Sequence, residues 1–199
     1  MPKRSLHLSQ DPDADKVISE NSLALLVGMV LDQQITIEKA FSSPAVLAQR
    51  MGAPLDAATI AAMDPDQLAS LFKERPALHR FPGSMAARVQ DVCRAVAEEY
   101  GNRVEAIWEG VRTGEELVTR LRALPGFGEQ KAKIFAALLG KQLGVRPEGW
   151  REATAPYGAE GSHLSVADIT DQKSLDEVRT TKRAMKAEAR ARARARAGA

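Results

Sequence analysis

Apolar residues along this chain recur at intervals of three and four positions, which is the spacing of one face of an α-helix. Leu23, Leu26 and Val30 show this spacing near the start, and Phe135 and Leu138 show it in the second half. No segment alternates convincingly between apolar and polar residues in the manner of a β-strand. The pattern therefore predicts an all-α fold.

Residues that cap helices mark where these helices should begin. The side chains of Ser, Thr and Asp accept hydrogen bonds from the unpaired N–H groups of a first helical turn. Such residues precede five of the apolar runs: Ser22, Thr36, Asp64, Ser84 and Thr113. Glu116 follows Thr113 at the spacing of a capping box. Gly52 and Gly101 are expected to end the second and the fourth of these helices.

The region 142–170 differs from the rest because it is rich in Gly and Pro. It predicts an ordered loop with one helical turn near Trp150. A loop of this length is too long to be a mere connection, so we expect it to be functional. Ser174 and Glu177 have capping-box spacing and predict a last helix that runs into the C-terminal tail.

Charge divides the chain into two parts, 1–177 and 178–199. The segment 178–199 holds eight Lys or Arg and one Glu, or +7, which leaves −5 for the body, since the whole chain carries +2. The tail alternates Ala and Arg, both good helix formers, so it can extend the last helix with arginines all round. Two interpretations stay open: a frayed, solvated end, or a sequence-independent attraction to DNA phosphates.

The remaining composition excludes several kinds of site. Cys93 is the only cysteine, so internal disulfides and four-cysteine metal or iron–sulfur sites are excluded. Its helical spacing with Val89 and Val96 predicts a buried structural thiol. The three histidines are scattered and show no metal-ligand spacing. The N-terminus Met1–Ser5 lacks the apolar stretch of a signal peptide, so we expect a cytoplasmic protein without a transmembrane segment.

The segment Leu124–Ala132, with the sequence LPGFGEQKA, joins two apolar helical runs. Pro125 ends the first helix because it disfavours a helical conformation in the residue before it. Gly126 and Gly128 allow positive φ and leave the backbone bare, and the next helix begins with unpaired N–H groups. This helix-hairpin-helix can hold an anion such as a DNA phosphate on main-chain donors. The alternative is a purely structural turn between antiparallel helices.

The hairpin pattern Leu-Pro-Gly-aromatic-Gly-x-x-x-Ala resembles that of the helix-hairpin-helix–GPD (HhH-GPD) superfamily of DNA glycosylases, in its cluster-free branch. The segment Leu26–Thr36, an apolar helix that ends in Gln-Gln, is similar to an early segment of the same superfamily. The stretch His79–Arg88 is like the family's lead into a basic helix. The resemblance covers residues 20 to about 150 and implies two helical lobes with a cleft between them.

The resemblance implies roles for residues in both motifs. Gln34 would fill the hole left by a flipped nucleotide, and Gln33 would support it. The hairpin residues expected at DNA are Gly126, Phe127, Gly128, Gln130 and Lys131. A monovalent cation would lie on three hairpin carbonyls, those of Arg122, Leu124 and Phe127.

Two departures from the family pattern bear on the chemistry. Gln130 stands where lyase members carry a lysine nucleophile, and an amide cannot form a Schiff base. Lys131 is adjacent, but one residue turns a helix by about 100° and points its side chain elsewhere. The family's aspartate is also absent from its usual spacing. Glu148 stands there instead, and Glu152 and Asp168 are further candidates; an exposed loop acid is the alternative for Glu148.

The expected function is that of a monofunctional DNA N-glycosylase of base-excision repair, a monomer that acts on damaged double-stranded DNA. The catalytic candidates are Glu148, Asp168 and Gln130. Trp150 and Tyr157 could stack on the flipped base or pin the loop to the core. Two other functions stay open: a non-catalytic DNA-binding protein that has lost the acid, and a helical adaptor for a protein partner.

Overall fold

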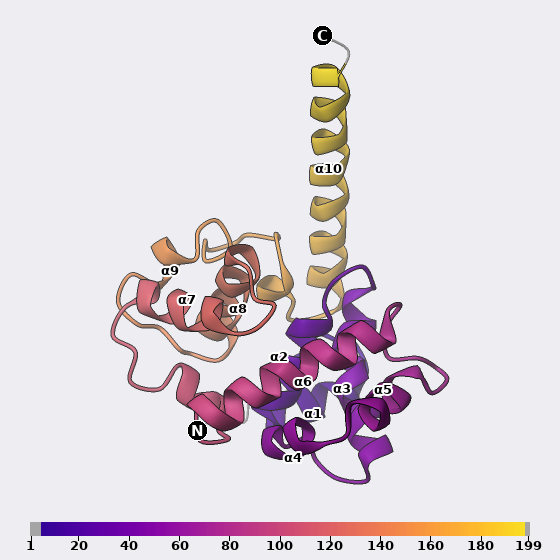
Figure 1. The fold of residues 1–199 in the computed structure, drawn as a ribbon. Coiled ribbons are helices and arrows are strands. Elements are labelled where there is room, and N and C mark those ends of the chain that lie inside the picture. Colours follow the sequence, from indigo (N-terminus) through magenta and orange to yellow (C-terminus); the bar gives the residue numbers. More distant parts are fainter. Residues whose placement is uncertain (1–4, 198–199) are drawn as a thin grey trace.

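The computed structural model describes residues 5–197, with side chains described up to residue 194, and within this range the chain is helical without β-strands. The first lobe contains six helices: α1 (Pro12–Glu20), α2 (Ser22–Leu31), α3 (Ile37–Met51), α4 (Ala57–Ala62), α5 (Pro65–Lys73) and α6 (Pro82–Glu99). The second lobe contains α7 (Gly114–Ala123), α8 (Glu129–Gln142), the short α9 (Trp150–Ala153) and the 3₁₀ turn η2 (Val166–Asp168). The all-α prediction is confirmed (Figure 1).

The long helix α6 leads from the first lobe into the second through a 3₁₀ turn, η1 (Val104–Ile107). It packs on α2, α4 and α5, and its buried face carries Val89, Val92, Cys93 and Val96. Cys93 is fully buried, and burial raises the pKa of its thiol to about 12. The predicted structural thiol is confirmed.

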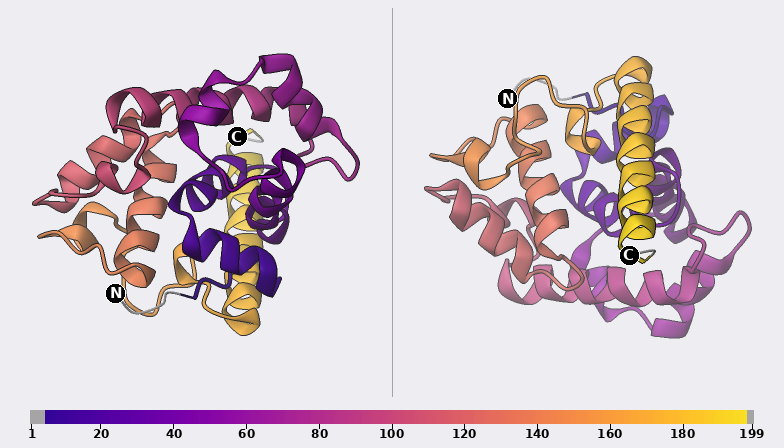
Figure 2. Two further views of the ribbon diagram at one scale, coloured as in Figure 1. Left: turned by 90° about the horizontal axis from the view of Figure 1, so that it is seen from below. Right: turned by 90° about the horizontal axis from the view of Figure 1, so that it is seen from above.

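The last helix, α10 (Gln172–Ala197), is anchored at its base and then leaves the body of the protein. Leu175 and Val178 are fully buried there, and η2 packs against the helix. The rest of α10 projects beyond both lobes (Figure 1). The two lobes lie on either side of the base of this helix (Figure 2). The helix crosses residue 177 without a break, so the division of the chain at that residue remains a prediction from charge.

Several predicted caps are confirmed and others move by a few residues. Thr36 and Asp64 cap α3 and α5 as predicted, and Gly52 ends α3 with a φ of 70°. Helix α2 is capped by Asn21 instead of Ser22. Asn21 also ends the preceding helix α1, which the sequence pattern did not predict. α6 begins at Pro82, before Ser84, because Pro is well suited to a first helical turn.

The two predicted capping boxes differ from the structure in detail. Thr113 accepts the Glu116 amide as expected, but the Glu116 carboxylate accepts the N–H of Arg112 instead of that of Thr113. At α10 the reciprocal pair is Asp171 with Ser174, because the helix begins at Gln172, two residues before the predicted cap Ser174.

Close packing of α2 against α3 depends on a glycine. A Cβ at Gly28 would lie 2.5 Å from the ring of Phe41, so a larger residue could not occupy this place without moving the helices apart. This contact fixes the direction in which α2 ends and hence the position of the turn that follows it. None of the helices in the described residues is both long enough and apolar enough to cross a membrane.

Candidate functional site

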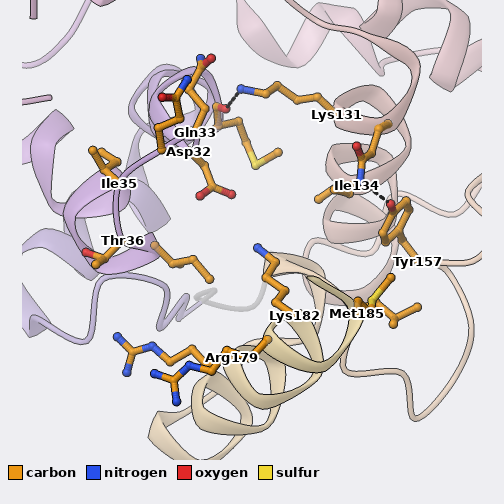
Figure 3. A pocket seen from close by; sticks show the side chains of 16 residues that line it. Asp32, Gln33, Ile35, Thr36, Lys131, Ile134, Tyr157, Arg179, Lys182 and Met185 are labelled. Carbon is orange, nitrogen blue, oxygen red and sulfur yellow. Dashed lines mark hydrogen bonds between the residues drawn. The ribbon is translucent and has the colours of Figure 1, made fainter. Parts of the chain in front are cut away.

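A cleft of about 600 Å³ lies where the two lobes and the base of α10 meet. Three parts of the chain contribute most of its wall: the turn 32–36 after α2, the first two turns of α8, and the α10 residues Arg179, Lys182 and Arg183. Tyr157 from the long loop completes the wall (Figure 3). The cleft thus joins the two sequence motifs, which are almost 100 residues apart in the chain.

The hairpin between α7 and α8 has the expected shape, with one correction. Gly126 has a φ of 75° and requires glycine. Gly128 has a φ of −75°, so its backbone is open to any residue and the prediction of a second positive φ is wrong. It serves as the N-cap of α8 without a side-chain hydrogen bond to the first turn. A Cβ at either glycine would meet nothing within 4 Å.

The start of α8 therefore offers main-chain donors on a bare surface. The first helical hydrogen bond of α8 runs from the Ala132 amide to the Gly128 carbonyl, which leaves the amides of residues 129–131 unpaired in the helix. The positive end of the helix dipole adds to the attraction for an anion. This arrangement is suited to a phosphate.

The turn after α2 holds one glutamine and exposes the other. The Gln33 side chain donates to the Val30 carbonyl and accepts from Arg88, and its backbone carbonyl accepts from Nε2 of His79. The His79 ring is nearly buried, and its Nδ1 accepts the Phe81 amide. Gln34 is exposed at the tip of the turn with a φ of 58°. The structure thus ties Gln33 into the protein and leaves Gln34 exposed at the wall of the cleft.

Lys131 ties the two lobes together. Its Nζ donates to the carbonyls of Met29 and Val30 at 2.6 and 3.1 Å, in the last turn of α2. A cation at this helix end is stabilised by the helix dipole. Burial lowers the pKa of Lys131, Asp32 opposes this shift, and Arg88 adds to it. The amine is occupied by carbonyls and points away from Gln130, in agreement with the predicted divergence.

Asp32 is the carboxylate that the structure places in the cleft. It follows Leu23–Leu31, nine consecutive buried residues, and its amide ends α2 by donating to Gly28. The carboxylate points into the cavity, where the Lys182 ammonium approaches it from α10 (Figure 3). Burial raises the pKa of Asp32, and the charges of Lys182 and Lys131 act in the opposite direction.

Sequence reasoning missed Asp32 as a candidate. The available signal was its position: an acid directly between a fully apolar helix and the Gln-Gln pair. The spacing from the hairpin favoured acids in the long loop instead, namely Glu148, Glu152 and Asp168.

Gln130 and Tyr157 meet at the second-lobe wall of the cleft. The Gln130 amide donates to the Tyr157 hydroxyl at 2.8 Å, so the aromatic ring is held beside the cavity. Trp150 is different: it is 7% exposed and packs on the backbone of α8, where a Cβ at Gly140 would lie 2.4 Å from its ring. Of the two aromatic candidates, Tyr157 faces the cleft and Trp150 pins the loop to the core.

Glu148 lies outside the cleft. Its backbone pairs with the start of α7, where its carbonyl accepts the Gly114 amide and its amide donates to the Arg112 carbonyl. The residue is exposed, and so is Glu152 on α9. Glu148 thus has the expected spacing from the hairpin, but its backbone pairs with the start of α7, away from the residues that line the cleft. This placement argues against both acids as the catalytic carboxylate.

Asp168 is buried among hydrogen-bond donors and belongs to the support of the loop. Its side chain is 3% exposed and 2.5 Å from the Lys141 amine. It also accepts from Ser162 Oγ and from the amides of Leu164 and Ser165. Four donors thus converge on this carboxylate, which is not among the residues that line the cleft.

The chain matches the model of the HhH-GPD superfamily of base excision DNA repair proteins over residues 27–197. It belongs to this family. The match begins inside α2 and includes the Gln-Gln turn, the hairpin, the long loop and α10, so it extends past the residue near 150 where the predicted resemblance ended. No curated protein and no solved structure matches the chain. Membership in the HhH-GPD family implies DNA as the partner and base-excision repair as the process.

Proposed function

We propose that this HhH-GPD protein is a monofunctional DNA N-glycosylase that hydrolyses the glycosidic bond of a damaged base flipped into the cleft. The observation that carries the proposal is the convergence of three groups on one cavity of about 600 Å³: the exposed Gln34, the first turn of α8 and the Asp32 carboxylate. Each supplies a different part of such a reaction.

Flipping a base out of the duplex costs a few kcal/mol of stacking and pairing. Gln34, at the tip of a turn braced by His79 and Arg88, is placed to fill the gap that the nucleotide leaves. The unpaired amides at the start of α8 hold the neighbouring phosphate, and the bare surface of Gly128 lets it approach closely.

Cleavage breaks the bond between the sugar carbon and the base nitrogen, and the base leaves with the electron pair. Positive charge develops on the sugar, and a preorganised carboxylate in a dry site stabilises such charge. Asp32 takes this role in our proposal: it faces the sugar, accepts a proton from the attacking water and returns that proton to solvent. Burial raises the pKa of Asp32, and the charges of Lys182 and Lys131 oppose this shift.

The monofunctional assignment rests on the state of the amines. Gln130 replaces the hairpin lysine, and the Lys131 amine is bound to two carbonyls of α2. Hydrolysis should therefore leave an intact abasic site, and strand breaks should appear only after alkali.

The experiment is a panel of duplexes that each carry one damaged base. Release of a base with alkali-dependent breakage supports the proposal. A covalent adduct trapped by borohydride would contradict the monofunctional mechanism, and its mapping would name the amine, with Lys182 the one that faces Asp32 across the cavity.

A second candidate function, a non-catalytic DNA-binding protein, is favoured by the placement of Glu148 outside the cleft. It predicts that no duplex of the panel loses a base, although the protein binds DNA. The same panel therefore separates the two functions.

The hairpin fits the monovalent cation that the family resemblance implies. Arg122 lies in the last turn of α7, and Leu124 and Phe127 lie in the hairpin turn, where the Phe127 amide donates to the Leu124 carbonyl at 3.1 Å. Within the described residues no backbone hydrogen bond reaches the carbonyls of Arg122 and Phe127 from outside a helix. Such a cation would supply positive charge next to a phosphate. The cation, the monomeric state and the cytoplasmic location stay predictions.

A further inference from the structure

The basic residues of α10 lie mostly on one side of the helix. At about 100° per residue, six of them fall within an arc of about 120°. We call this set the basic stripe: Arg179, Lys182, Arg183, Lys186, Arg190 and Arg194. The arginines of the described helix are therefore unevenly spread around it, because alternate arginines advance by about 200° and every second one returns to nearly the same side.

Arg192 provides the contrast within the same segment. It lies about 160° from both Arg190 and Arg194 around the helix axis. Its guanidinium faces the Glu188 carboxylate at 4.0 Å, so the charge on that side is partly compensated. From Lys182 outward, the stripe residues form no ion pair in the part of the chain that the structure describes.

The stripe begins inside the cleft and continues outside it. Arg179, Lys182 and Arg183 line the cavity, and Arg179 is also paired with Glu38 of α3, which fixes the base of the helix to the first lobe. Lys186, Arg190 and Arg194 are exposed on the part of α10 that projects from the body (Figure 1). A ligand in the cleft that continued outward would follow this line of cations.

From these observations we propose that the basic stripe of α10 binds the phosphate backbone of intact duplex DNA beside the damaged nucleotide. The proposal rests on the proposed function for the position of the lesion in the cleft. Its dimensions fit: Lys186 and Arg194 are about 12 Å apart along the helix. Phosphates of one strand advance by about 3.4 Å along the duplex axis, so this length covers three to four of them.

Charge complementarity favours DNA as the occupant. Residues 1–177 carry a net charge of −5, so the body as a whole repels a polyanion. The hairpin holds its phosphate with neutral amides, which give position without long-range attraction. The stripe supplies the missing attraction at the point where duplex would leave the cleft.

The test uses three single variants of the full chain, Arg190→Ala, Arg192→Ala and Arg194→Ala. All three remove one arginine that stands between two alanines, and Ala keeps the helix. Binding to an undamaged duplex is measured over a range of salt concentrations, and circular dichroism checks the helix content.

We expect a periodic result. Arg190→Ala and Arg194→Ala should each weaken binding severalfold and reduce the salt slope by about 0.9, the value for one lost phosphate contact. Arg192→Ala should leave the slope unchanged. Equal losses of affinity in all three variants would show that only the net charge of the helix matters. No loss in any variant would show that DNA does not bind this surface. Either result overturns the proposal.

Two further measurements distinguish DNA from RNA as the ligand and separate DNA binding by the stripe from base release. An RNA duplex of the same length should compete more weakly than DNA, and stronger competition would overturn the assignment of the ligand. Base release should be unchanged in Arg192→Ala, because Arg192 lies outside the stripe and does not line the cleft. Since undamaged duplex is the ligand, the binding result stands even if no base is ever released, which keeps the two proposals independently testable.

Discussion

Asp32 and Asp168 are two partly buried carboxylates, one near the first turn of α8 and the other against Lys141 near its end, and their surroundings differ in almost every respect. Asp168 accepts hydrogen bonds from a lysine, a serine hydroxyl and two backbone amides. Asp32 faces an open cavity, and the pKa of its carboxyl is raised by burial without compensation from any hydrogen bond. One carboxylate organises a loop, and the other is available to a ligand.

The comparison shows that burial alone does not identify a reactive group. A carboxylate whose acceptor capacity is satisfied stabilises the fold, because the donors around it also need partners. A carboxylate that is desolvated but lacks donors is held in an unfavourable state, which is typical of functional sites. Substitutions at these two carboxylates and around them should therefore have very different effects.

The largest effect is expected for Asp32→Asn. The amide has the same shape but no charge to stabilise the sugar cation or to accept a proton, so base release should fall by about 100-fold or more. DNA affinity should be equal or higher, because a charge that repels phosphate is lost. Single-turnover excision and equilibrium binding measure the two effects, and full turnover in the variant would remove Asp32 from the mechanism.

The same variant should gain stability at neutral pH. The pKa of Asp32 is raised in the folded state, so the ionised form costs folding free energy, and this cost disappears as the pH falls below the ordinary pKa of Asp. Asp32→Asn should therefore melt at a higher temperature than the parent at pH 7 and at the same temperature in acid. Activity of the parent should decline as the pH falls through the raised pKa.

Asp168→Asn should show the opposite balance. It removes one partner of a buried pair and leaves the Lys141 charge uncompensated, at a cost of about 3 kcal/mol. Chemical denaturation measures this loss, and excision by the remaining folded protein should be normal. A stable variant without excision would transfer the catalytic role to the loop.

Alanine variants of the two hairpin glycines should distinguish backbone strain from contact with a phosphate. Gly126→Ala places a side chain at a φ of 75° and should lower both stability and DNA binding. Gly128→Ala introduces no such strain, and its methyl group meets no protein atom within 4 Å. Its expected effect is a loss of DNA affinity of about tenfold with nearly normal stability, since only a bound phosphate would meet the methyl group. Unchanged affinity would make the hairpin a structural turn.

The smallest effect is expected for Glu148→Gln. The carboxylate is exposed outside the cleft, and the backbone hydrogen bonds of this residue do not depend on its side chain. Excision, affinity and stability should all match the parent. Loss of excision would mean that DNA binding brings Glu148 to the site, which would transfer the role proposed for Asp32 to Glu148.

Local structure could be predicted from the residues alone: the all-α class, the caps at Thr36 and Asp64, the hairpin and the Gln-Gln turn. These features depend on residues within a few positions of one another, so spacing and cap chemistry are sufficient to predict them. The tertiary structure decided which acid faces the cleft. Glu148 has the right distance along the chain from the hairpin, but its pairing with Arg112 and Gly114 turns it outward. Asp32 is desolvated because α8 and α10, which begin 97 and 140 residues later in the sequence, pack around it. Spacing counts residues along the chain, whereas the direction and the solvation of a side chain depend on contacts between distant parts of it.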